Sequence, residues 1–185
     1  MKVVATVGFP GSGKSVFEDV AGDLGVPVVS MGDVIRNEVD RRGLEQTDDN
    51  LGDVAVELRE RHGDDVVAER CVDLVSEALE DSDDDVVLVD GVRGEAEVEL
   101  FREEFGDALE VVAVEVPFDV RLERLSERGR SDDMSSEEEL RRRDERERGY
   151  GLDEAMEGAD TVVENVGTIN EFKDVARGVL QDGDR

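Results

Sequence analysis

Short apolar runs alternate along the chain with longer stretches in which apolar and charged positions follow a helical period. The apolar runs are rich in valine and predict strands at residues 2–7, 26–30, 86–90, 110–116 and 161–164. The stretches around them predict helices at residues 14–24, 33–42, 51–61, 64–80, 94–105, 118–129, 135–149 and 168–181. Continuous apolar runs are typical of strands that are covered on both faces. The pattern therefore predicts a three-layer α/β fold, with about five parallel strands and helices on both faces.

The length of the chain and its uniform composition indicate how many domains it has. A chain of 185 residues can bury a substantial core, and no linker, repeat or break in composition divides it. We therefore expect a single domain over residues 1–185. No apolar run approaches the ~18 residues of a membrane helix, so we expect no membrane partner.

The segment GFPGSGKS fills the phosphate-binding loop pattern G-x-x-x-x-G-K-[ST] between the first strand and the first helix. In this context backbone N–H groups and a helix N-terminus can surround phosphate oxygens. Lys14 can reach the β- and γ-phosphates of a nucleotide, and the Ser15 hydroxyl can ligate Mg²⁺. A glycine-rich turn with a chance lysine is the alternative. The motif predicts a P-loop NTPase fold with ATP and Mg²⁺ as cofactors, bound by Gly8, Pro10, Gly11, Ser12, Gly13, Lys14 and Ser15.

Asp90 follows the apolar run of the third strand, downstream of the phosphate loop. A carboxylate in this position is expected to organise Mg²⁺ or to contact the phosphoryl acceptor. The alternative is an N-cap of the helix predicted at 94–105. Arg93 follows Asp90 and could bind phosphate through two parallel hydrogen bonds, although a solvated arginine is equally simple.

A second polar cluster follows the second strand, where Asp33 stands at a helix start and Arg36 about one turn later. Arg36 could point back over the strand ends, where ligands of parallel sheets bind. Capping alone would explain Asp33, and solvation alone would explain Arg36.

Arginines gather after the fourth strand, in a chain that is otherwise acidic. They are Arg121, Arg124, Arg128, Arg130, Arg141, Arg142, Arg143, Arg146 and Arg148. Phosphoryl transfer needs cations around the equatorial oxygens of the moving group. Glutamates are interleaved with these arginines, so surface ion pairs along helices are the alternative.

The overall charge is extreme, with 51 acidic and 22 basic residues and a formal net charge of -29. Few lysines, many carboxylates and small apolar residues resemble the proteins of extreme halophiles, in which salt screens self-repulsion. A binding surface for a basic partner is the alternative. The charge disfavours nucleic acid as a partner. Cys71 is the only cysteine, so no disulfide framework exists and we expect a reducing, cytoplasmic location.

Together these motifs resemble the nucleoside monophosphate kinase group, of which adenylate kinase is the best-known member. GFPGSGKS matches its phosphate loop, SMGDVIR its acceptor motif and VDGVR its Asp-Gly-x-x-Arg segment. Pro117, Arg124 and Arg128 match a proline and two arginines that enter its lid. More closely, RGRSDD with RRRDERERGYGL looks like a small archaeal family of adenylate-kinase-like proteins, some of which carry a dephospho-CoA kinase label.

The resemblance implies transfer of the γ-phosphoryl group of ATP to a nucleotide or nucleotide-like small molecule. It implies an acceptor-binding helical region at about 31–80 and a lid region at about 121–150, the latter short because only Gly129 separates Arg128 from Arg130. The residues are assigned to catalysis (Lys14, Asp90, Arg124, Arg128), to the acceptor (Asp33, Arg36, Arg93, Arg130, Arg142) and to the metal (Ser15, Asp90). The rival function is a nucleotide-dependent switch that hydrolyses ATP slowly and acts through a protein partner. The oligomeric state is left open.

Overall fold

A computed structural model describes residues 1–81, 85–128 and 136–181 of the chain. Its centre is a sheet of five parallel strands in the order β2-β3-β1-β4-β5. The strands are β1 Lys2–Val7, β2 Val28–Ser30, β3 Val86–Val92, β4 Leu109–Glu115 and β5 Thr161–Glu164. The prediction of about five parallel strands in an α/β fold is confirmed.

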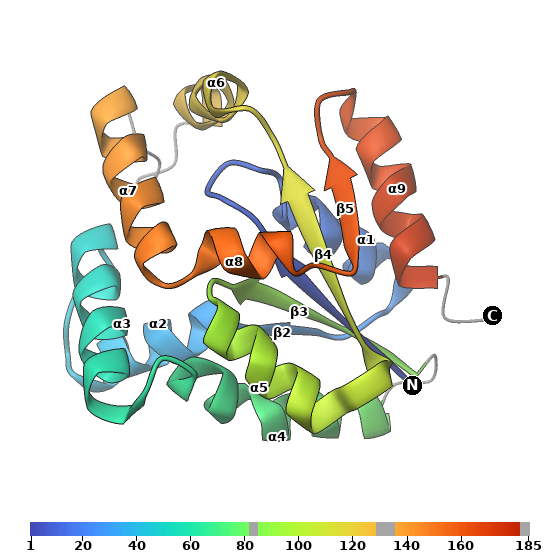
Figure 1. Cartoon of the computed structure of the whole chain (residues 1–185), viewed down its shortest axis with the longest axis horizontal. Helices are drawn as coiled ribbons and strands as arrows, with labels where there is room; N and C mark the ends of the chain where they lie inside the picture. Colours follow the sequence, from blue (N-terminus) through green and yellow to red (C-terminus); the bar gives the residue numbers. More distant parts are fainter. Residues whose placement is uncertain (82–84, 129–135, 182–185) are drawn as a thin grey trace.

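Helices cover both faces of the sheet, as Figure 1 shows. Along β1 the side chains alternate, because successive residues of a strand face opposite sides. Val3, Ala5 and Val7 pack into one core with the helices α2 Met31–Arg41, α3 Asp48–His62, α4 Val66–Asp81, α5 Glu95–Phe105 and α8 Leu152–Glu157. Val4 packs into the second core, with α1 Ser15–Leu24 and α9 Ile169–Gln181.

The remaining helices, α6 Phe118–Arg128 and α7 Glu137–Gly149, lie over the carboxyl ends of the strands in the view of Figure 1. A short 3₁₀ helix, η1 Gly106–Ala108, leads into β4. Ligands of parallel sheets bind at the carboxyl ends of the strands. The arginine-rich segment therefore lies at the edge where ligands are expected.

Three of the differences between the structure and the predicted elements have a clear physical reason. β3 continues through Asp90 and Gly91, because the ladder with β1 shifts register between Ala5 and Val7 and then pairs Val7 with Val92. α3 starts at Asp48, where the Thr47 side chain accepts a hydrogen bond from the Asn50 N–H at 3.2 Å. α8 was not predicted, since its six residues span too few turns for a period to stand out.

Candidate functional site: a phosphate loop and an arginine cavity

The phosphate loop folds as a sharp turn between β1 and α1. Gly11 and Gly13 have φ angles of 81° and 95°, in the left-handed region that favours glycine. The Lys14 ammonium donates hydrogen bonds back to the loop, to the Gly8 carbonyl at 2.5 Å and the Phe9 carbonyl at 3.4 Å. Burial lowers the pKa of Lys14, and the charges of Asp90, Arg93 and Glu147 also act on it. A nucleotide phosphate would restore a counter-charge to this lysine.

Two distant side chains hold the loop from outside. Asn165, which follows β5, donates a hydrogen bond from Nδ2 to the Ser12 carbonyl at 2.9 Å. Arg121 of α6 donates a hydrogen bond from Nη1 to the Pro10 carbonyl at 2.9 Å. It also donates two hydrogen bonds, of 3.0 and 2.6 Å, to the carboxylate of Asp144 of α7. Arg121 and Asp144 are almost fully buried. The loop is thus tied to both α6 and α7 by a buried ion pair.

A cavity of about 580 Å³ opens beside the loop. Its lining includes Lys14, Ser15, Asp90, Arg124 and Asn165. Arg124 donates from Nη2 to the Asn165 carbonyl at 2.9 Å, which places its guanidinium at the cavity wall. We call this space the donor cavity. It brings together most of the residues that the sequence assigned to ATP.

The carboxylates of Asp90 and Glu18 lie together in the donor cavity. Asp90 Oδ1 accepts a hydrogen bond from the Thr6 hydroxyl at 3.0 Å. Burial raises the pKa of Glu18 to about 7, and the charge and hydrogen bond of Asp90 add to this rise. Helix α5 is capped at Gly94, so Asp90 does not serve as its N-cap. Asp90 therefore lines the donor cavity and does not cap α5.

A second cavity of about 110 Å³ lies between α2, α3, α7 and the end of β3. Gly91, which directly follows Asp90 in the chain, lines it, and so does Arg93, two residues further on. Its other arginines come from three helices: Arg36 of α2, Arg59 of α3, and Arg143 and Arg146 of α7. We call this space the acceptor cavity, after the function that the sequence predicts for it.

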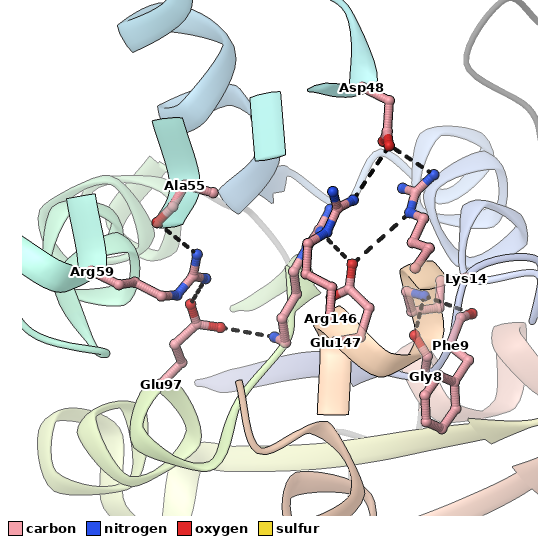
Figure 2. Close-up of polar contacts among 11 residues, drawn as sticks. Gly8, Phe9, Lys14, Asp48, Ala55, Arg59, Glu97, Arg146 and Glu147 are labelled. Atoms are coloured by element: carbon pink, nitrogen blue, oxygen red, sulfur yellow. Dashed lines mark hydrogen bonds and ion pairs between the residues drawn. The ribbon is translucent and has the colours of Figure 1, made fainter. Parts of the chain in front are cut away.

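Carboxylates hold several of these arginines, and one of these carboxylates, Glu147, is buried. Arg93 Nη1 lies 2.7 Å from Glu147 Oε1, and the Glu147 side chain is only 3% exposed. Asp48, at the start of α3, lies 3.5 Å from Arg143 and 3.4 Å from Arg146. In Figure 2 the group of Asp48, Arg146 and Glu147 lies between Lys14 and the pair of Arg59 and Glu97. Two arginines of α7, Arg143 and Arg146, are thus held at the acceptor cavity by the start of α3.

Arg59 of α3 is buried and lines the acceptor cavity. Its Nη2 lies 2.6 Å from Glu97 Oε1, and its guanidinium lies 4.3 Å from the centre of the Tyr150 ring. Glu97 Oε2 accepts a hydrogen bond from the Arg93 backbone N–H at 2.8 Å. Both partners of this ion pair are buried.

Asp33 and Arg36 form an ion pair of 2.6 Å on the first turns of α2. Arg36 also donates from Nη2 to the Ser30 hydroxyl at 3.2 Å, which turns it back toward the end of β2. A Cβ atom on Gly32 would lie 3.0 Å from Arg36 Nη1, so the glycine leaves room for the guanidinium. Arg36 lines the acceptor cavity, whereas Asp33 holds Arg36 from outside it.

The other arginines that the sequence singled out fall in different places. Arg128 is the last residue of α6 and its side chain is outside what the structure describes, as is all of Arg130. Arg142 is exposed on α7 and lines neither cavity, whereas Arg143 and Arg146 of the same helix face the acceptor cavity. The helical period explains this difference, because neighbouring residues of a helix point about 100° apart.

Several residues of these cavities were not assigned from the sequence. Glu18 stands one turn beyond Ser15, and that spacing could have indicated it. Asn165 follows a predicted strand at the edge where ligands bind, which is also a readable signal. Arg59, Glu97, Asp48 and Tyr150 lie in ordinary helical patterns or at helix ends, and only the tertiary structure brings them together.

Comparison with known proteins identifies the fold and the family of the chain. A family model described as an AAA domain matches residues 7–141, which run from the phosphate loop into α7. Three solved structures share the fold: a gluconokinase from Sinorhizobium meliloti (TM-score 0.58, 21% identity), TT1252 from Thermus thermophilus (0.67, 19%) and a shikimate kinase from Aquifex aeolicus (0.51, 19%). They cover 97%, 100% and 94% of this chain, and the chain covers 91%, 98% and 92% of them. The fold is therefore that of P-loop kinases.

Sequence relatives are closer. The chain is 54% identical over 180 residues to a UPF0200/UPF0201 protein of Archaeoglobus fulgidus, a match of 97% of this chain and 55% of that protein. It is 49% identical to a UPF0200 protein of Methanosarcina barkeri and 41% identical to one of Halobacterium salinarum, with 94% and 97% of this chain and 91% and 93% of theirs covered. The chain belongs to the UPF0200 family. It spans about half the length of the A. fulgidus relative and nearly all of the other two.

Within residues 1–81, 85–128 and 136–181, no three His, Cys, Asp or Glu side chains gather closely enough to hold a metal ion by themselves. No helix in that part of the chain combines the length and the apolar character needed to cross a membrane.

Proposed function

We propose that this protein is an ATP- and Mg²⁺-dependent kinase that transfers the γ-phosphoryl group to a nucleotide or nucleotide-like acceptor. In this proposal the phosphate loop, Lys14 and Arg124 bind ATP in the donor cavity. The acceptor lies in the acceptor cavity, with an anionic group against Arg36 and Arg93. Phosphoryl transfer takes place where the two cavities meet, beside Lys14 and Asp90.

One observation supports this proposal above the others: consecutive residues of β3 line the two cavities. Asp90 lines the donor cavity, and Gly91 lines the acceptor cavity. The charges of Asp90, Arg93 and Glu147 all act on the pKa of Lys14. A phosphoryl group held by Lys14 would therefore lie close to a molecule in the acceptor cavity, which is the proximity that group transfer requires.

The donor cavity suits Mg²⁺. The Ser15 hydroxyl and the Asp90 and Glu18 carboxylates are hard oxygen ligands, and Mg²⁺ usually takes few protein ligands beside phosphates and waters. When bound, the ion would neutralise charge that develops on the phosphate oxygens. The carboxylate of Asp90, fixed by Thr6, would orient the ion or its water shell.

The test is an assay of ADP formation from ATP and Mg²⁺ in molar KCl. The acceptors are AMP, CMP, UMP, GMP, dephospho-CoA and nucleosides, each tested alone. Acceptor-dependent ADP formation that is lost in the Lys14→Ala variant supports the proposal. Slow ATP hydrolysis that no acceptor accelerates contradicts it.

That contrary result would favour the second candidate, a nucleotide-dependent switch. One observation favours it: the A. fulgidus relative carries a second family designation, and 55% of its length matches this chain. Fusion of two proteins in one relative suggests that they act together in others. Under this candidate, a UPF0201 protein would bind this chain and change its rate of ATP hydrolysis.

A further inference from the structure

Glu97 is a buried carboxylate that bonds to two residues lining the acceptor cavity, Arg59 and Arg93. Its side chain is 1% exposed. One carboxylate oxygen accepts a hydrogen bond from Arg59 Nη2 at 2.6 Å, and the other accepts one from the Arg93 backbone N–H at 2.8 Å. Glu97 lies on α5, and the two groups that it holds lie on α3 and at the end of β3.

Arg59 is held on three sides. Besides Glu97, it donates from Nη1 to the Ala55 carbonyl at 3.3 Å, and its guanidinium lies over the ring of Tyr150. The left part of Figure 2 shows Arg59 between Ala55 and Glu97. An arginine fixed in this way loses little freedom on binding an anion, because its side chain is already ordered.

We propose that Glu97 is a positioning residue of the acceptor site, which fixes Arg59 and the Arg93 backbone so that both arginines can bind an anionic group of the acceptor. The inference rests on the proposed function for the use of the cavity, but its chemistry concerns anion binding alone. Glu97 itself lies behind the two arginines that it holds. Its effect therefore reaches the ligand only through Arg59 and Arg93.

The nearly isosteric variant Glu97→Gln tests this role, because a glutamine amide has one acceptor oxygen where Glu97 uses two. Inorganic phosphate is the probe, titrated calorimetrically into the full chain in KCl. The donor cavity is first filled with Mg²⁺ and the non-hydrolysable analogue AMP-PCP, so that phosphate cannot bind the phosphate loop. We expect the dissociation constant of phosphate to rise by about tenfold or more, the size of effect that follows the loss of a charge-assisted hydrogen bond. The affinity for AMP-PCP should stay within about twofold.

A second variant separates positioning from simple support of the fold. Breaking a buried ion pair destabilises a protein, but replacing both partners by neutral groups of similar volume often restores stability. In the double variant Glu97→Gln, Arg59→Met the melting temperature should recover while phosphate affinity stays low. If phosphate affinity recovers with the melting temperature, Glu97 serves only the fold and the proposal is wrong. The control is Arg61→Met, which removes an exposed arginine of the same helix that pairs with Glu57.

Other outcomes also decide the question. Unchanged phosphate affinity in Glu97→Gln would overturn the proposal, and so would a wild-type protein that binds no phosphate once AMP-PCP is present. If phosphate binds and the variant weakens it, but no acceptor stimulates ADP formation, the positioning role stands and the kinase function fails. The two proposals can thus fail separately.

Discussion

The donor and acceptor cavities lie side by side, but one is formed by a backbone loop and the other by side chains from several elements. The donor cavity is formed around one continuous loop, whose glycines give it its curvature, and its positive charges are those of Lys14 in the loop and Arg124 of α6. The acceptor cavity is formed by arginine side chains from α2, α3, α7 and the end of β3, held in place by carboxylates. A backbone site depends on local conformation, whereas a side-chain site depends on the packing of distant elements. The two should therefore respond differently to mutation and to salt.

The largest effect should come from the buried tie between the loop and α7. Asp144→Ala leaves the buried Arg121 without its counter-charge, and breaking such a pair costs about 3–5 kcal/mol of unfolding free energy. Chemical denaturation in KCl measures this loss. Asp153→Ala is the control, because its pair with Arg148 is about half exposed and such pairs contribute at most ~1 kcal/mol. Equal effects of the two variants would show that the Arg121 pair does not hold the fold.

The next largest effect is expected in the donor cavity, where Lys14 binds phosphate under the proposed function. Lys14→Ala removes a charge-assisted hydrogen bond to phosphate, worth ~1.5–3 kcal/mol, so ATP affinity or turnover should fall by about tenfold or more. An ATP titration measures it, and an unchanged melting temperature shows that the fold persists. Normal ATP binding and turnover in this variant would remove the basis of the proposed donor site.

A smaller effect is expected on the acceptor side. Arg93→Ala and Arg36→Ala should raise the KM of the acceptor or lower kcat while ATP binding stays nearly intact. Arg93 should matter more, because it pairs with the buried Glu147, whereas Arg36 pairs with the exposed Asp33. Steady-state kinetics at saturating ATP measure both. Arg177→Ala is the matched control: Arg177 pairs with Asp174 at the same spacing as Arg36 with Asp33, but on α9.

The smallest effect should be the response of ATP binding to salt. The screening length is ~10 Å at 0.1 M and ~3 Å at 1 M, so added KCl should weaken the self-repulsion of a chain with net charge -29 and raise its melting temperature. Once the protein is folded, added KCl should lower the affinity for ATP only modestly. It should lower the affinity of the acceptor cavity for phosphate more. Circular dichroism melts and titrations over a KCl series measure these responses. A melting temperature that stays flat or falls with KCl would favour a basic partner as the reason for the acidity.

The same contrast explains what the sequence could predict. The loop, its strand and its helix are contiguous, so residues 8–15 predicted both the fold and the placement of the donor cavity. Arg36 and Arg93 were found because each follows a strand, and the carboxyl ends of parallel strands meet at one edge. Arg59 and Glu97 are 38 residues apart and sit in helices with ordinary patterns, so no local signal indicates their contact. In the arginine-rich stretch the sequence indicated the helix but not its rotation, which turns Arg143 and Arg146 rather than Arg142 toward the cavity.

Helix α7 has a consequence for how this family can diverge. Asp144 ties the helix to the phosphate loop through Arg121, and Glu147, one turn further on, holds Arg93 of the acceptor cavity. A single inserted or deleted residue between them would rotate one contact about 100° away from the other. An insertion or deletion in this segment would therefore disturb either the phosphate loop or the acceptor cavity. Under the proposed function, a lineage that adopts a new acceptor can change α2 and α3 more freely than α7, because Arg36 bonds to Asp33 and Ser30, and Arg59 to Ala55 and Glu97, rather than to the phosphate loop.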